Sequence, residues 1–269
     1  MSDQGAPAVL AQGLVKDYTD GDEKVEAVRG VDLEVRTGEI FGFLGPNGAG
    51  KSTTVRMLTT LLTITGGRAE VAGVDVSEDP DQARAKIGVA LQEAGLDPRQ
   101  TGRELLVLHG RLFGLDSEQA RERAKQLLSL VDLEGAADRV TKGYSGGMQR
   151  RLDLAAALVH EPPVLFLDEP TTGLDPEARL IVWEELRRIN KRGTTVFLTT
   201  QYLEEADQLC DRIAIIVEGK IVKQGTPDQL KADLRDRGVH KEPTLEDVFL
   251  DATGRTRERA AGEVQEVAA

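Results

Sequence analysis

The 269-residue chain has little cysteine and no long apolar segment. Its single cysteine, Cys210, excludes an internal disulfide bond and a cysteine-rich zinc site, and suits a reducing cytoplasm. The longest apolar runs, at residues 154–159 and 213–217, are much shorter than the roughly 18 residues of a membrane-spanning helix. The N-terminal residues also lack the basic segment and apolar core of a signal peptide, so we expect none. If the protein works at a membrane, we expect the membrane span to belong to another chain.

Positive charge is also scarce, because 34 lysine and arginine residues stand against 46 aspartate and glutamate residues and give a net charge of −12. Non-specific nucleic-acid binding depends on clustered lysine and arginine, so this balance argues against it, although a local basic patch stays compatible with the composition. The histidines His109, His160 and His240 have no partners at metal-ligand spacing, and we expect structural or surface roles for them. The length is enough for one large α/β domain or two small ones.

The most informative segment is the glycine-rich stretch at residues 45–52, Gly-Pro-Asn-Gly-Ala-Gly-Lys-Ser. It follows an apolar run at 40–44, which predicts a buried strand, and it leads into 51–62, which has helix-compatible composition. A strand, a Gly-x4-Gly-Lys-Ser turn and a helix are typical of a phosphate-binding loop, in which backbone N–H groups and the helix N-terminus surround a phosphate chain. We predict that Lys51 reaches the β- and γ-phosphates of a nucleoside triphosphate and that the Ser52 hydroxyl coordinates Mg²⁺.

Two adjacent carboxylates follow another apolar run, at residues 164–167. Asp168 ends this predicted strand, which is where phosphate-loop enzymes hold a carboxylate that coordinates Mg²⁺. Glu169 is well placed to accept a proton from an attacking water molecule. Adjacent carboxylates also occur as solvated loop residues, but a phosphate loop roughly 120 residues upstream favours the catalytic interpretation.

The segments before the phosphate loop indicate an antiparallel sheet. Residues 9–15 and 31–35 are predicted strands, the second with period-two alternation, and Tyr18 is expected in a polar turn between them. Further strands are predicted at 68–72, 87–91, 164–167, 195–199, 213–217 and 221–223.

A helical segment is predicted between the strands, at about residues 95–160. Thr101 and Glu104 have the spacing of a capping box, which predicts the start of the first of its helices. The predicted helices of the chain after the phosphate loop are 101–113, 117–131, 147–160, 175–191, 203–209, 227–234 and 244–250. We expect one domain over residues 1–253 and a polar flexible tail over 254–269.

A second glycine-containing helix start lies at residues 144–150, Tyr-Ser-Gly-Gly-Met-Gln-Arg. Ser145 followed by two glycines at a helix N-terminus provides a second backbone site for an anion. One molecule has little use for a second such site unless the site binds the phosphate of a neighbouring chain. A plain N-capped helix after a glycine-rich loop gives the same pattern, so this segment alone leaves both interpretations open.

In their order and spacing, these motifs resemble those of the ATP-binding cassette (ABC) family, and the resemblance covers nearly the whole chain. Gln92 follows a predicted strand, as does the glutamine that precedes the family's helical subdomain, and Tyr18 falls where the family stacks an aromatic ring on adenine. The other matching segments are the phosphate loop at 45–52, the signature motif at 145–147, the acidic pair after its strand at 164–169 and the next loop at 174–175. Residues 199–207 and 243–250 more narrowly resemble the daunorubicin-resistance type of drug-export ATPase, which pairs with a separate membrane subunit.

The resemblance implies an ABC ATPase fold, which is a phosphate-loop NTPase core with a mixed sheet, an N-terminal antiparallel β-subdomain and an inserted α-helical subdomain. It also implies an ATPase in which two cassettes, as a homodimer or with a related chain, close head to tail on ATP and Mg²⁺. Hydrolysis would power efflux of a drug-like or lipid-like hydrophobic substrate through an integral membrane permease, a separate chain, at the cytoplasmic face of the cell membrane. An isolated monomer is expected to hydrolyse ATP weakly, and no nucleic-acid partner is expected.

The same resemblance assigns roles to individual residues. Those assigned to the nucleotide are Tyr18, Gly45, Pro46, Asn47, Gly48, Ala49, Gly50, Lys51, Ser52, Thr53, Ser145, Gly146, Gly147 and Asp175. Those assigned to Mg²⁺ are Ser52, Gln92 and Asp168. Those assigned to catalysis are Lys51, Gln92, Glu169 and Gln201.

The chain departs from the family pattern in two places. The signature motif begins with Tyr144 and has Met148 where glutamine is usual. Gln201 stands where most cassettes have a histidine that contacts the γ-phosphate. Glutamine can donate a hydrogen bond but cannot carry charge or move a proton at neutral pH. If Gln201 takes that place, we expect slower turnover or a stronger dependence on Glu169, with nucleotide binding unaffected.

Two other classes stay open as weaker alternatives. Cassette ATPases of translation or DNA repair usually carry two cassettes in one chain or a long coiled-coil insertion, whereas this chain has one phosphate loop and no extended heptad run. A GTPase of the common type would use Asn-Lys-x-Asp to recognise guanine, and residues 190–193, Asn-Lys-Arg-Gly, lack the aspartate. The transported compound is not identified by the sequence.

Overall fold

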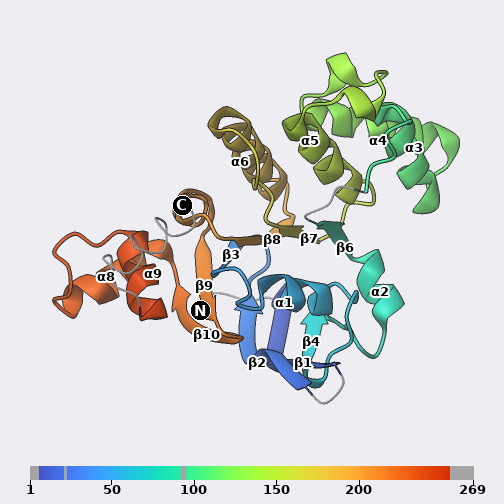
Figure 1. Cartoon of the computed structure of the whole chain (residues 1–269). Helices are drawn as coiled ribbons and strands as arrows, with labels where there is room; N and C mark the ends of the chain where they lie inside the picture. Colours follow the sequence, from blue (N-terminus) through green and yellow to red (C-terminus); the bar gives the residue numbers. More distant parts are fainter. Residues whose placement is uncertain (1–5, 21–22, 92–94, 255–269) are drawn as a thin grey trace.

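The computed structural model describes residues 6–20, 23–91 and 95–254, and their strands form two sheets (Figure 1). The first sheet has the strand order β2-β1-β4-β5 and is antiparallel. Its strands are β1 (Val9–Asp20), β2 (Glu23–Val35), β4 (Gly66–Val71) and β5 (Val74–Asp75). The antiparallel sheet predicted ahead of the phosphate loop is therefore confirmed, although β5 was not predicted.

Tyr18 lies within β1, so its predicted place in a turn is wrong. The strand continues past Val15 through polar residues, and Tyr18 pairs with Val25 of β2. The ladder between two strands is made by backbone N–H and C=O groups, which do not depend on the side-chain pattern. The predicted strand ended too early because its bounds were taken from the apolar pattern, whereas the backbone pairing of β1 continues through polar residues.

The second sheet has the order β10-β9-β3-β8-β7-β6. Its strands from β9 to β6 run parallel, and β10 is antiparallel to β9, so the sheet is mixed, as the resemblance implied. The strands are β3 (Ile40–Leu44), β6 (Ile87–Ala90), β7 (Val164–Asp168), β8 (Thr195–Thr200), β9 (Arg212–Val217) and β10 (Lys220–Gly225).

The central strands β3, β7 and β8 are buried at every position, because both faces of this sheet are covered. On one face lies α1 (Lys51–Leu58), which contacts strands of both sheets and so fills the space between them. The helix ends at Leu58 and is shorter than predicted, because Thr60 has a left-handed φ of 63°, which is incompatible with continuation. This packing fixes the start of α1, and with it the phosphate loop, against the end of β3.

The predicted helical segment contains α3 (Gly102–Leu112), α4 (Ser117–Leu130) and α5 (Gly146–Ala157), which form a lobe beyond β6 in Figure 1. The capping box is confirmed, because the Thr101 hydroxyl accepts from the Glu104 amide and the Glu104 carboxylate accepts from the Thr101 amide. The short helix α2 (Pro80–Ala85) was not predicted. Its signal was present, since Asp79 is the N-cap and Pro80 the first helical residue.

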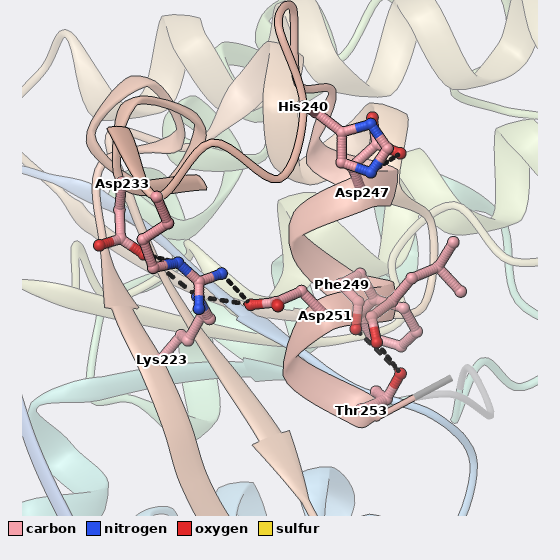
Figure 2. Close-up of polar contacts among 9 residues, drawn as sticks. Lys223, Asp233, His240, Asp247, Phe249, Asp251 and Thr253 are labelled. Atoms are coloured by element: carbon pink, nitrogen blue, oxygen red, sulfur yellow. Dashed lines mark hydrogen bonds and ion pairs between the residues drawn. The ribbon is translucent and has the colours of Figure 1, made fainter. Parts of the chain in front are cut away.

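The remaining helices are α6 (Pro176–Asn190), α7 (Leu203–Leu209), α8 (Pro227–Asp236) and α9 (Leu245–Thr253). Figure 2 shows how α8 and α9 are joined to β10. Lys223 of β10 contacts Asp233 of α8 at 3.3 Å and Asp251 of α9 at 3.0 Å, and Arg237 contacts both carboxylates. These ion pairs are partly exposed, so each contributes little to the free energy of unfolding. Buried apolar residues such as Leu234 contribute more to holding the two helices in place.

Within the described ranges, no helix combines the length and apolar character that crossing a bilayer requires. The same part of the chain contains no group of three or more histidine, cysteine or acidic residues placed to hold a metal ion.

Candidate nucleotide-binding site

The phosphate loop connects β3 with α1, and its glycines stand where a side chain would be strained or would clash. Gly48 and Gly50 have φ angles of 78° and 106°, in the left-handed region. A Cβ atom on Gly45 would lie 2.5 Å from the carbonyl oxygen of Ile216. One on Gly50 would lie 2.6 Å from the carbonyl oxygen of Ala27. The loop therefore needs glycine both for its conformation and for its close approach to neighbouring backbone.

A cavity of about 400 Å³ lies over this loop. It brings together the predicted phosphate loop and two residues that were assigned to catalysis from distant parts of the chain, Glu169 and Gln201. Its lining consists of residues 46–48 and 50–53 of the loop with Ala27, Glu169, Thr172 and Gln201.

Lys51 directs its ammonium group into the mouth of this loop. Its Nζ donates to the carbonyl oxygens of Gly45 at 2.8 Å and Pro46 at 3.2 Å, and lies 3.3 Å from Glu169 Oε1. The side chain is only 4% exposed, so water screens its charge weakly. A buried ammonium group at this position is a strong partner for a phosphate.

Ser52 and Asp168 meet beneath the cavity. The Ser52 hydroxyl donates to Asp168 Oδ1 at 3.2 Å, and the Thr199 hydroxyl donates to the same oxygen at 2.5 Å. Hydroxyl and carboxylate oxygens are the donors that Mg²⁺ prefers, so this pair fits a magnesium ion that also binds phosphate oxygens. Gln92, the third residue assigned to the metal, lies outside the described residues.

Glu169 is held in a strained backbone conformation, with a φ of 50°. Its amide donates to the hydroxyl of Thr199 at 3.0 Å and to the carbonyl of the same residue at 3.2 Å. One carboxylate oxygen faces Lys51, and the other accepts from the Thr172 hydroxyl at 3.1 Å. The side chain is thus oriented from two sides at the edge of the cavity, as a group that must position one water molecule requires.

The signature segment lies at a different cavity, of about 270 Å³. Ser145 is the N-cap of α5, and its hydroxyl accepts from the amide of Met148 at 3.3 Å. Gly146 and Gly147 line this cavity too, together with Asp175, which is the N-cap of α6 and accepts from the Ala178 amide. In the described part of the chain this cavity has no lining residue in common with the cavity over the phosphate loop. One copy of the chain therefore does not bring its own signature segment to its own phosphate loop.

A buried carboxylate supports the loop that carries Glu169. Glu205 of α7 accepts from the Thr171 hydroxyl at 2.8 Å and from the Trp183 indole at 2.9 Å. Burial raises the pKa of Glu205 above its ordinary value. Trp183 is 3% exposed, and the contacts of Glu205 join α6 and α7 to the loop after β7.

Tyr18 lines neither of these two cavities in the part of the chain that the structure describes. Tyr18 is 39% exposed, with Lys16 Nζ 5.4 Å from the ring centroid. Its assignment to adenine stays a prediction.

Sequence reasoning missed two hydroxyl groups that hold the acidic pair. Thr172 follows Glu169 by one turn of the loop, and Thr199 pairs with Asp168 in the ladder between β7 and β8. The first could have been found from its position close to the carboxylate. The second needed the strand register, which the sequence does not specify.

The fold and the geometry of the phosphate loop define a phosphate-loop nucleoside triphosphatase. A sequence model of the family described as "ABC transporter" matches residues 28–172. The chain belongs to this family, and it is an ATPase. The class predicted from the motifs is confirmed, and the GTPase alternative is set aside.

The relatives include export and resistance proteins. The chain is 53% identical over 234 residues to "Daunorubicin/doxorubicin resistance ATP-binding protein DrrA" of Streptomyces peucetius, over 87% of this chain and 70% of that protein. It is 47% identical over 205 residues to "Nod factor export ATP-binding protein I" of Paraburkholderia xenovorans, over 76% of this chain and 67% of that protein. The resemblance to the daunorubicin-resistance type is thereby confirmed.

Solved structures support the fold. A dimeric structure of the ATP-binding cassette MJ0796 in a post-hydrolysis state, bound to ADP and Pi, has a TM-score of 0.74 and 28% identity. It covers 81% of this chain and 98% of the solved chain. A structure of an ATP-binding subunit of an ABC transporter has a TM-score of 0.78 and 26% identity, over 91% of this chain and 99% of that one.

Proposed function

We propose that this chain is the ATP-hydrolysing subunit of an exporter and works as a pair of cassettes bound to a separate integral membrane permease. The permease would lie in the cell membrane, with this chain on its cytoplasmic face. The transported compound would be a hydrophobic drug-like or lipid-like molecule.

One observation carries the paired arrangement: among the residues that the structure describes, the phosphate loop and the signature segment line two cavities without a common residue. A two-fold dimer can place the Ser145 end of one copy against the phosphate loop of the other and repeat the same contact by symmetry. The nucleotide would then be held by Lys51 and the loop amides from one side and by Ser145 and Gly147 from the other. The dimeric structure of the MJ0796 cassette supports this arrangement.

The described residues divide the chemistry between binding and orientation. When phosphates enter the cavity, their charge competes with Glu169 for the ammonium group of Lys51, which lies within 3.3 Å of the carboxylate. Thr172 then keeps Glu169 in place, so that the carboxylate can orient a water molecule and accept its proton. Gln201, at the same cavity, can donate a hydrogen bond to the γ-phosphate.

Ser52 and Asp168 would hold Mg²⁺, with Gln92 as a further ligand, and the ion would neutralise charge on the phosphates. The oriented carboxylate of Glu169 distinguishes a hydrolytic site from one that only binds nucleotide, because binding alone needs no such group.

The relatives support the exporter assignment. Relatives of this chain carry names of daunorubicin and doxorubicin resistance or Nod factor export. Those names concern the relatives, and for this chain they suggest that an amphipathic or apolar compound is moved. The permease follows from the same similarity, because a transported compound needs a path through the bilayer.

The paired arrangement is tested first by the dependence of ATP hydrolysis on protein concentration. We expect the rate per chain to rise with concentration, and Glu169→Gln to accumulate as a dimer with MgATP during size-exclusion chromatography. A rate per chain that is constant in a sample shown to stay monomeric would contradict the proposal.

A mixing experiment then tests which surfaces meet. Lys51→Ala and Ser145→Arg chains are each expected to be inactive, but a mixed dimer has one site with both halves intact. Random pairing predicts up to roughly a quarter of the wild-type rate in an equal mixture. The matched control mixes Lys51→Ala with a chain that carries both substitutions, which leaves no intact site. A test mixture no faster than the control would refute the head-to-tail pairing.

The permease is tested by co-purification of tagged Glu169→Gln from native membranes in the presence of MgATP. A stoichiometric multi-span polypeptide would support the exporter, and uptake of daunorubicin by inside-out vesicles containing both chains would test the substrate class. Recovery of ribosomes or DNA in place of a membrane polypeptide would favour the non-transport alternative and leave the ATPase activity intact.

A further inference from the structure

Arg150 is a buried arginine in α5 that contacts the sheet strands next to the nucleotide cavity. Its side chain is 12% exposed, and α5 packs beside β6 (Figure 1). The guanidinium donates to the carbonyl oxygens of Leu91 at 2.6 Å, Pro170 at 2.9 Å and Asp168 at 3.1 Å. All three acceptors are main-chain groups at or just beyond the ends of β6 and β7.

These three carbonyls flank the residues that act on the nucleotide. Asp168 and Pro170 stand on either side of Glu169, and Leu91 immediately precedes Gln92, which lies outside the described residues. A planar guanidinium with fixed donor directions can hold several carbonyls at once, which a lysine ammonium group cannot do with the same geometry. Arg150 therefore constrains the backbone on both sides of the catalytic carboxylate.

Asp153 orients this guanidinium from the same helix. Its Oδ2 lies 3.3 Å from Arg150 Nη1, and its side chain is 14% exposed. Burial raises the pKa of Asp153 to about 6, and the positive charge of Arg150 partly offsets that rise. Asp153 also lines an apolar cavity of about 280 Å³, together with Leu61 and Phe113.

We propose that Arg150, oriented by Asp153, is a positioning residue that links the signature helix to the catalytic carboxylates. Ser145 begins the same helix, so a contact at the start of α5 moves Arg150 as part of one rigid element. Through its hydrogen bonds, the guanidinium then moves the carbonyl groups on either side of Glu169. This inference rests on the proposed pairing of two cassettes, in which the start of α5 contacts the nucleotide of the partner.

The expected signature is a loss of turnover without a loss of binding. Neither Arg150 nor Asp153 lines the cavity over the phosphate loop, so nucleotide affinity should be unchanged in their variants. Substitution of residues that orient metal ligands typically costs about 10-fold to 100-fold in activity. We expect Arg150→Met to lower kcat by that amount with KM for ATP and the Kd of a fluorescent ATP analogue within about twofold. Arg150→Lys and Asp153→Asn should keep part of the rate.

The matched control is Arg123→Met in α4. Arg123 is 19% exposed and donates to the carbonyls of Leu158 and Val159. The Arg123→Met variant therefore loses the same kind of hydrogen bond, but at the C-terminal end of α5, far from the signature residues. We expect its thermal stability to fall as in Arg150→Met while kcat stays near the wild-type value.

The experiment measures kcat, KM, analogue affinity and thermal unfolding on the full chain. A kcat of Arg150→Met within twofold of wild type, or an equal fall in Arg123→Met, would overturn the proposal. If Arg150→Met does not fold, Arg150→Lys and Asp153→Asn carry the test, and full activity in both would overturn it. Failure of the proposed pairing is recognised separately, because it would appear in the wild-type chain as a rate independent of concentration.

Discussion

The carboxyl of Asp153 should make the stability of this protein depend on pH in a direction opposite to that of an aspartate whose pKa is lowered on folding. Burial moves its pKa from 3.8 in the unfolded chain to about 6 in the folded one. The folded state thus binds this proton more tightly, so the contribution of the group to stability is fully present below pH 3.8 and is lost as the pH rises through 6. Replacement by asparagine removes the titration.

The size of the effect follows from the two pKa values. Between pH 5 and pH 7.5, linkage with these values lowers the free energy of unfolding of the wild type by about 1.4 kcal/mol relative to Asp153→Asn. The charged or titratable groups around Asp153 are Arg150 on its own helix and Arg84, His109 and His160 at the same cavity. They are present in both proteins, so most of their own titration cancels in the difference.

The assay is urea unfolding followed by circular dichroism at pH 5 and pH 7.5 and constant ionic strength. A suitable control is Asp138→Asn, because Asp138 is exposed and the hydrogen bond from Arg103 lowers its pKa, which places its titration below this range. A difference between Asp153→Asn and wild type that stays constant with pH, or that changes in the opposite direction, would refute the reasoning.

Three further predictions concern the site and the core. Lys51→Ala should lower kcat for ATP roughly 100-fold or more and weaken nucleotide binding, because the buried cation that faces the phosphates is lost; steady-state hydrolysis and analogue titration measure both. Thr172→Val should lower kcat roughly tenfold with KM unchanged, since only the orientation of Glu169 is affected, and an equal change in KM would speak against it. Phe197→Ala should lower the free energy of unfolding by about 3–5 kcal/mol in urea titrations, because its fully buried ring contacts three other phenylalanine rings; a loss below about 1 kcal/mol would show that the core refills the space.

The phosphate loop and the acidic pair were predictable because each is a local pattern at the end of a buried strand. Short apolar runs such as 40–44 and 164–167 are typical of buried strands, and β3 and β7 have nearly those bounds. Parallel strands then bring their carboxyl ends to one edge of the sheet, which is why Ser52 and Asp168 are in contact.

Contacts that depend on register or on main-chain acceptors were not predictable. The contact of Thr199 with Asp168 requires that β7 and β8 pair in one register, which no local pattern specifies. The contacts of Arg150 end on carbonyl oxygens, which every residue has, so they leave no signal at the acceptor positions. The turn predicted at Tyr18 was wrong for a related reason, because the backbone ladder of β1 extends through polar residues.

The use of main-chain acceptors by Arg150 also determines where this contact tolerates substitution. A change of side chain at Leu91 or Pro170 leaves the carbonyl oxygen in place, so the hydrogen bond survives as long as the backbone does. A change at Arg150 removes all three bonds at once, and no residue on the strand side can replace them. Sequence variation is therefore tolerated at Leu91 and Pro170 and restricted at Arg150, and an engineered cassette could exchange these two strand-end residues while it keeps the arginine.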